Sequence, residues 1–177
     1  MNLKKYLPYE NYILTSSINK EEIISRLQEN ISIKYHTAFQ KKQNTICEKP
    51  YEGTINENNF LIHRVIDYRN SFLPIISGEI TSKLTGSEIH IKMQLNKFTR
   101  IFISLWLGII SLVCIGMTVA LIVNFSKIAN QEFRLAGLIP FGMLVFGLLL
   151  TILGFKTESA KSKIFLEELL EGKEKSN

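Results

Sequence analysis

The chain has 177 residues, of which 46% are hydrophobic, and it carries a formal net charge of +5 at pH 7. This length allows one modest domain and a further segment, and so mild a positive charge is not typical of a nucleic-acid-binding protein. Two cysteines, Cys47 and Cys114, are too few and too far apart for a disulfide framework, and they fit a reducing cytoplasm.

The N-terminal part predicts a short strand followed by a helix. Residues 12–16 are β-like, and Asn19 is a candidate N-cap with Glu22 three residues later, as in a capping box. Apolar side chains then recur every fourth residue and predict an amphipathic helix over about 20–31, at Ile23, Leu27 and Ile31. The polar segment 32–50 is interpreted as a long connection, with a partner-binding or membrane-contacting loop as the alternative.

Two hairpins follow. Residues 51–55 and 60–66 flank a polar turn, and residues 72–82 and 88–96 flank a second one. Strict alternation of apolar and polar residues in the last strand gives it one apolar and one polar face. The sequence therefore predicts an α+β fold with an antiparallel sheet of four to five strands, its apolar face covered by one or two helices.

The stretch YRNSFLPIISGEI (Tyr68–Ile80) combines polar, apolar and backbone-restricting residues. Pro74 belongs at the start or the exposed side of a strand, and Gly78 indicates a bulge or a close backbone approach. The polar residues before this strand are typical of a turn: Asp67, Asn70 and Ser71. A structural role is favoured over a chemical one.

Two segments are long and uncharged enough to span a bilayer, at about residues 101–126 and 135–155. Of the 21 Lys and Arg residues, 14 lie in residues 1–100, five in 156–177 and two in the short turn between the spans. By the positive-inside rule, both long ends face the cytoplasm. The spans contain no Asp, Glu, Lys, Arg or His, which argues against a transporter.

The tail from Thr157 to Gly172 is expected to form a helix that ends at Gly172. Its predicted apolar stripe is Ala160, Ile164, Phe165, Leu169 and Leu170. We predict a discontinuous cytoplasmic α+β domain of residues 1–100 and 156–177, with a transmembrane hairpin of residues 101–155 inserted into it. The alternative is a tail helix on the membrane surface, which its acidic polar face disfavours.

Catalytic, cofactor-binding and metal-binding patterns are not found. The sequence has no nucleophile elbow, no paired carboxylates on one element and no phosphate loop, and its histidines lack a carboxylate or cysteine at ligand spacing. An enzyme is not expected. We predict partner or lipid contacts on the polar face of the sheet and beside the membrane, through Arg64, Arg69, Asn70, His90, Lys92, Lys97 and Arg100.

Several motifs together resemble an uncharacterised family of small bacterial two-helix membrane proteins. They are Gly53 and Phe60, YRNSFLPIISGEI, EIHIKMQL, and a two-span hairpin ending in GFKTE. The resemblance covers about residues 51–158 and implies topology only. More loosely, a strand meander closed by a C-terminal helix is similar to bacterial pleckstrin-homology-like domains, from which the early helix at 20–31 departs.

The expected function is that of a membrane-anchored cytoplasmic binding or accessory module without catalysis. The expected place is the inner (plasma) membrane, with several passes and with the N- and C-termini in the cytoplasm. Expected partners are a bilayer with anionic head groups and another protein, and self-association through the spans is left open; nucleic acid is not expected. Two alternatives are an immunity or stress-protection membrane protein and a lipid or small-ligand sensor.

Overall fold

A computed structural model describes residues 7–33, 49–68, 70–123 and 131–175 of the chain. The chain divides into two compact units, Met1–Asn96 with Gly154–Asn177, and Lys97–Leu153. We refer to the first as the sheet unit and to the second as the helical unit.

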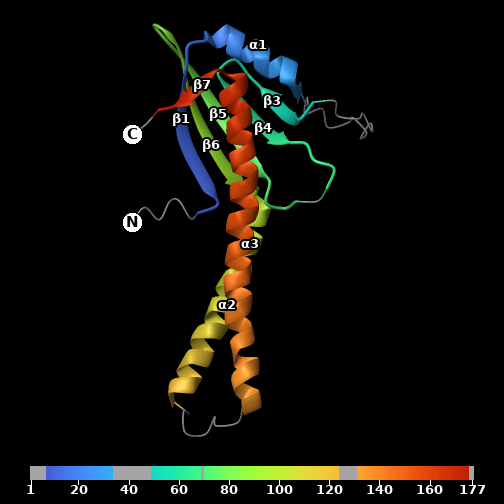
Figure 1. The fold of residues 1–177 in the computed structure, drawn as a ribbon, viewed down its shortest axis with the longest axis vertical. Coiled ribbons are helices and arrows are strands. Elements are labelled where there is room, and N and C mark those ends of the chain that lie inside the picture. Colours follow the sequence, from blue (N-terminus) through green and yellow to red (C-terminus); the bar gives the residue numbers. More distant parts are fainter. Residues whose placement is uncertain (1–6, 34–48, 69, 124–130, 176–177) are drawn as a thin grey trace. The chain divides into compact units, whose positions relative to one another are not determined.

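The sheet unit is built on one mixed sheet. Its seven strands within the described residues are β1 (Tyr9–Ser16), β2 (Ile31–Ile33), β3 (Tyr51–Ile55), β4 (Asn59–Arg64), β5 (Pro74–Lys83), β6 (Gly86–Leu95) and β7 (Gly172–Glu174). Their order is β2-β3-β4-β5-β6-β1-β7. β2 and β3 pair in parallel, and the other neighbours pair antiparallel. Figure 1 shows β5, β6 and β1 side by side in the sheet.

The predicted α+β class is confirmed, but the prediction of four to five antiparallel strands is wrong. The additional strands, β2 and β7, have three residues each, which is too short for an alternating pattern to show in the sequence. In addition, Ile31 continues the apolar spacing of the preceding helix, so the periodicity assigns it to the helix rather than to β2.

Helix α1 (Lys20–Asn30) begins where the sequence predicts. The side chain of Asn19 accepts a hydrogen bond from the backbone N–H of Glu22 at 2.8 Å, which confirms the N-cap. Ile23 and Leu27 are fully buried. The Glu22 carboxylate pairs with Arg26 on the next turn, at 2.8 Å.

Alternate residues of the strands form the core on the face covered by the helices. The fully buried strand residues include Leu14, Ile62, Ile76, Ile91 and Met93. The Tyr51 ring stacks on Phe165 of helix α3 (Gln131–Leu169), with 4.2 Å between ring centroids. Each such large apolar side chain contributes roughly 1.5–3 kcal/mol when it is fully buried, so the covered face is the main source of stability in the sheet unit.

The face of α3 that packs on the sheet matches the predicted one only in part. Phe165 and Leu170 of the predicted stripe pack inward, whereas Ala160 and Ile164 are exposed. The fully or nearly fully buried residues of this part of α3, and just past its end, are Phe155, Glu158, Ser159, Ser162, Leu166 and Leu170. Polar residues are tolerated on this face because they have partners. Ser162 lies 3.2 Å from the Tyr51 hydroxyl and Ser159 lies 3.1 Å from a Glu10 carboxylate oxygen. Counting only apolar residues therefore includes two exposed positions and leaves out the buried polar ones.

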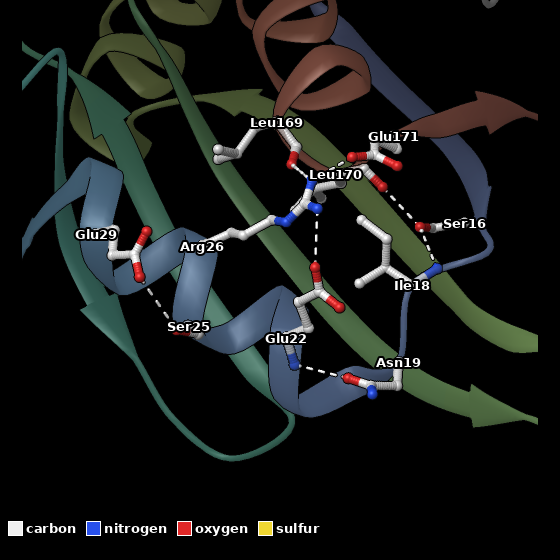
Figure 2. A network of polar contacts seen from close by, with 10 residues as sticks. All are labelled: Ser16, Ile18, Asn19, Glu22, Ser25, Arg26, Glu29, Leu169, Leu170 and Glu171. Carbon is white, nitrogen blue, oxygen red and sulfur yellow. Dashed lines mark hydrogen bonds and ion pairs between the residues drawn. The ribbon is translucent and has the colours of Figure 1, made fainter.

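The C-terminal end of α3 is fixed to α1 and β1 (Figure 2). Arg26 donates to the Leu169 carbonyl at 3.3 Å, and its guanidinium pairs with Glu171 at 2.7 Å. The hydroxyl of Ser16 donates to the Leu170 carbonyl at 2.6 Å. These contacts satisfy carbonyl groups that a helix end leaves without intrahelical donors.

The predicted helix stop at Gly172 is also corrected. The left-handed residue after the helix is Glu171, with φ 45°, and Gly172 is the first residue of β7. Glycine is preferred at such a position because it has no Cβ. The ion pair with Arg26 gives a reason for a glutamate there instead.

The helical unit contains α2 (Lys97–Val123) and the adjoining part of α3. Within the described residues, α2 and the Gly137–Leu169 part of α3 are long and apolar enough to cross a membrane, with mean hydropathy of 2.5 and 2.4. The helices approach closely at Gly147, where an added Cβ would lie 2.3 Å from the Trp106 ring.

Candidate functional site

The face of the sheet opposite α1 and the C-terminal part of α3 presents polar side chains from five adjacent strands. One row of directly paired residues crosses β3, β4, β5, β6 and β1 in that order: Thr54, Leu61, Ser77, Lys92 and Asn11. A second row crosses the last four of these strands: Asn59, Glu79, His90 and Ile13. We call this surface the open face.

A shallow hollow of about 520 Å³ lies over the open face. Side chains of both rows line it, including Asn11, Thr54, Asn59, Ser77, His90 and Lys92. Amides and hydroxyls can donate and accept hydrogen bonds, while Lys92 adds a donor and Glu79 an acceptor. The hollow is therefore equipped to bind a polar ligand or polypeptide by hydrogen bonding.

The charges of the open face are mixed in sign. Glu79 and Lys92 have no ion-pair partner within the described part of the chain, and the His90 ring lies 4.0 Å from Glu88. Leu61, the second residue of the first row, is 49% exposed. A surface with both charges and an exposed apolar side chain among polar ones resembles a protein-binding patch more than a site for a polyanion.

The structure brings together two of the residues predicted from the sequence and separates a third. His90 and Lys92 both lie on the open face. Arg64, which the sequence analysis placed on the same polar face, lies on the covered face instead. Because side chains alternate along β4, Arg64 shares its side with the buried Phe60 and Ile62, and its guanidinium binds Glu158 of α3 at 2.7 Å.

The remaining predicted contact residues lie elsewhere. The Asn70 side chain accepts a hydrogen bond from the Phe72 backbone N–H at 2.9 Å, which is the turn geometry expected for asparagine. Lys97 and Arg100 lie in the first turn of α2 and belong to the helical unit. Arg69 lies outside the described residues.

Glu158 is the centre of a charged cluster on the covered face. Its carboxylate accepts hydrogen bonds from Arg64 at 2.7 Å, from the Tyr68 hydroxyl at 3.1 Å and from Lys161 at 3.0 Å. The Glu158 side chain is only 4% exposed. Burial raises the pKa of this carboxyl. The hydrogen bonds from Lys161, Arg64 and Tyr68 lower the pKa, and together they outweigh the effect of burial, so the net shift is downward.

This cluster has the properties of a structural contact. A carboxylate with a lowered pKa and three donors remains ionised at neutral pH and is a weak general base. Its partners tie the end of β4 and the β4–β5 connection to α3. The Phe72 side chain in the same connection packs on Gly154, where an added Cβ would lie 2.9 Å from the ring. Tyr68 and Phe72 are thus both held against α3.

Of the open face, only His90 and Lys92 are predicted from the sequence, and of the Glu158 cluster only Arg64, which is expected on the other face. Asn11 lies outside the predicted strand of residues 12–16, whereas β1 begins at Tyr9. Ser77 and Asn59 become site residues only through strand pairing. The sequence around Glu158 shows a lysine three residues later, which is indistinguishable from an ordinary surface pair.

Comparisons with protein-family models, curated proteins and solved structures find no match to this chain. The resemblance to small bacterial two-helix membrane proteins therefore stays a prediction.

Proposed function

We propose that this chain is a non-catalytic integral membrane protein in which the sheet unit is a binding module anchored by α2 and α3. The observation that carries the proposal is the open face, where five strands present polar side chains around a hollow of about 520 Å³. The module's ligand is another protein, because the face combines hydrogen-bonding groups, both charges and the exposed Leu61.

The anchoring part of the proposal is supported by helix length and by charge. α2 and α3 are long enough for the hydrocarbon core. The basic residues concentrate in residues 1–100 and 156–177 rather than between the spans. This favours a multi-pass protein of the inner (plasma) membrane with both termini in the cytoplasm. Anionic head groups would add about 1 kcal/mol for each nearby Lys or Arg.

Self-association through the spans is a further part of the proposal. Gly108, Gly116 and Gly142 have no atom within 4 Å of an added Cβ, so backbone at these positions is free for close packing by a second chain. Chemical cross-linking of the protein in native membranes tests this part. A cross-linked dimer that disappears when Gly108 and Gly116 are replaced by Leu is expected, and an unchanged dimer contradicts it.

Site-specific photocross-linking in cells tests the binding role. A photoreactive amino acid at Leu61, the exposed apolar residue of the open face, should give an adduct with a discrete protein. The same group at Ile164, which is 55% exposed on α3, is the control. We expect the Leu61 adduct to be lost when Lys92 and Asn11 are replaced by Ala. Identical adducts from both positions would contradict the proposal.

Replacing the hairpin separates this function from immunity or stress protection. If residues 97–153 are exchanged for an unrelated two-span anchor, a binding module keeps its photocross-linked partner and its deletion phenotype is rescued. Loss of rescue with an unchanged adduct assigns the function to the helical unit instead.

Labelling of a single cysteine tests the orientation. Leu84, in the turn between β5 and β6, is fully exposed. In a chain with both natural cysteines replaced by Ser, an impermeant maleimide should label Leu84→Cys only after the inner membrane is opened. Labelling of intact spheroplasts contradicts a cytoplasmic sheet unit.

A further inference from the structure

One end of the sheet is tied to the start of α2 by a very short connection. β6 ends at Leu95 and α2 begins at Lys97, so Asn96 alone separates them. At 3.8 Å between successive Cα atoms, the Cα atoms of Leu95 and Lys97 lie no more than about 8 Å apart. If α2 enters the bilayer, chain length alone keeps this end of the sheet near the membrane surface.

Strand pairing identifies what else lies at this end of the sheet. Tyr9, at the start of β1, pairs with Gln94, and Pro74, at the start of β5, pairs with Leu95. The β4–β5 connection, which contains Tyr68, leads into Pro74 at the same end (Figure 1). The turn that contains Leu84 lies at the opposite end of β5 and β6.

Large side chains are exposed along the end of the sheet next to Leu95. Leu7 is 53%, Tyr9 is 38% and Tyr68 is 55% exposed. The Tyr68 ring is also held in position, because its hydroxyl donates to the buried Glu158. Tyrosine is enriched at membrane–water interfaces, where its ring meets the apolar boundary and its hydroxyl stays in a polar layer.

We propose that this end of the sheet, with Leu7, Tyr9 and Tyr68 as its contact residues, rests in the head-group layer of the bilayer. The proposal depends on the proposed function, because α2 and α3 bring the bilayer to it. Lys97 and Arg100 in the first turn of α2 add charge attraction to anionic lipids beside this contact. Contact at this end of the sheet keeps the open face at a fixed distance from the membrane surface.

Tryptophan fluorescence in vesicles tests the proposal on the full-length chain. The chain has one tryptophan, Trp106, which lies in α2 about 8 Å past Ile101 at 1.5 Å per residue. The protein is reconstituted in phosphatidylcholine and phosphatidylglycerol vesicles, with acyl chains brominated either near the head group or near the chain end. Probes are placed in a Trp106→Phe chain as Tyr9→Trp, Tyr68→Trp or, as the control, Leu84→Trp.

We expect lipid brominated near the head group to remove most of the emission of the Tyr9→Trp and Tyr68→Trp chains, and lipid brominated at the chain end to remove less. Emission of the Leu84→Trp chain should not change with either lipid. Tyr68→Trp loses the hydrogen bond to Glu158; if that chain does not fold, Tyr9→Trp alone decides.

Comparing Trp106 with the introduced probes distinguishes a wrong membrane contact of the sheet end from a wrong assignment of the membrane spans. If Trp106 is quenched in the unaltered chain but Tyr9→Trp and Tyr68→Trp respond no more than Leu84→Trp, the proposed contact of the sheet end with the head groups is wrong. The proposed membrane spans are then still supported. If Trp106 itself is not quenched, α2 does not enter the bilayer, and both the proposed function and the proposed contact of the sheet end are wrong.

Discussion

Glu158 is a buried carboxylate whose three donors come from three parts of the sheet unit. Arg64 ends β4, Tyr68 lies in the β4–β5 connection and Lys161 lies one turn further along α3. Removing the charge of a buried acceptor leaves its donors without compensation, which costs more than the hydrogen bonds themselves contribute. The residue therefore connects local chemistry to the position of a whole loop.

Glu158→Gln should lower the free energy of unfolding by about 2–3 kcal/mol. The amide keeps the shape of the carboxylate, but its NH₂ group faces cationic donors, and Arg64 is left without a countercharge. The estimate is below that for a fully buried pair because the Arg64 side chain is 30% exposed. Chemical denaturation of the detergent-solubilised protein measures the change.

Glu168→Gln on the same helix is the matched control for this substitution. Glu168 is exposed, so we expect its replacement to change the free energy of unfolding by less than about 0.5 kcal/mol. Equal losses in the two variants would show that the Glu158 cluster does not stabilise the fold.

The lowered pKa of Glu158 also predicts a pH dependence. A carboxyl whose pKa is lower in the folded than in the unfolded chain stabilises the fold at neutral pH, and this contribution is lost as the pH falls through the folded value. The difference in unfolding free energy between the unaltered chain and Glu158→Gln should therefore shrink on acidification below about pH 4.3, the ordinary glutamate pKa. Denaturation of both chains from pH 7 to pH 3 measures it, and a constant difference contradicts the prediction.

Among the elements, β4 and β5 are neighbouring strands in which an aromatic ring of β4 packs over a glycine of β5. Gly78 lies directly opposite Phe60 in the register, and a Cβ at Gly78 would lie 2.1 Å from that ring. The β4–β5 and β5–β6 registers continue without a break at this residue. Of the two interpretations of Gly78 from the sequence, a bulge is excluded, and the close approach comes from a side chain rather than from another backbone.

Gly78→Ala should destabilise the sheet unit by about 1–3 kcal/mol, the usual cost of overpacking a filled core. Phe60 is only 2% exposed and has little room to move aside. Adding Phe60→Leu to Gly78→Ala should recover part of the loss, since the two changes act on one contact. Thermal unfolding of the single and double variants gives the coupling.

Ser77→Ala tests whether the effect belongs to the Phe60 contact. Ser77 is the neighbour of Gly78 on β5, but its side chain lies on the open face, so its loss should change the melting temperature little. A Gly78→Ala chain as stable as the unaltered one would show that Phe60 can move aside at no cost.

For the whole molecule, the sequence predicts those parts of the fold that have a long repeating pattern. Three such features are the N-cap at Asn19, the pairing of residues 51–55 with the next strand, and the two apolar helices. Each is marked in the sequence by a pattern over several residues or by the end of one. β2 and β7 lack such a pattern, because their pairing energy comes from neighbours distant in the chain.

The residues of the candidate site also divide into those that a repeating sequence pattern predicts and those that it does not. His90 and Lys92 are predictable as polar members of an alternating strand, whereas Arg64 at the end of β4 is not, because its placement depends on the partner it finds in Glu158. The sheet-facing side of α3 is only partly predictable from hydropathy, since Ser159 and Ser162 are buried through hydrogen bonds to residues more than 100 positions away. Tertiary partners, not local composition, decide these cases.

The sheet unit brings the last residues of the chain back to the first ones. Phe155, Leu166 and Leu170 are fully buried in it, β7 adds a strand beside β1, and Glu158 neutralises Arg64. At roughly 1.5–3 kcal/mol for each large buried side chain, the three apolar residues alone contribute an amount comparable to the net stability of a typical domain, about 5–15 kcal/mol.

Residues 1–96 expressed alone should therefore fail to fold, whereas residues 1–96 joined to 154–177 by a flexible Gly/Ser linker should fold cooperatively in water without detergent. Circular dichroism and denaturant unfolding distinguish the two, and the linked chain carrying Glu158→Gln should unfold at a lower denaturant concentration than the linked chain without it. A fragment 1–96 that unfolds cooperatively at the same midpoint as the linked chain would mean that the tail is dispensable, and the core contacts of Phe155, Leu166 and Leu170 would then contribute nothing to the stability of the sheet.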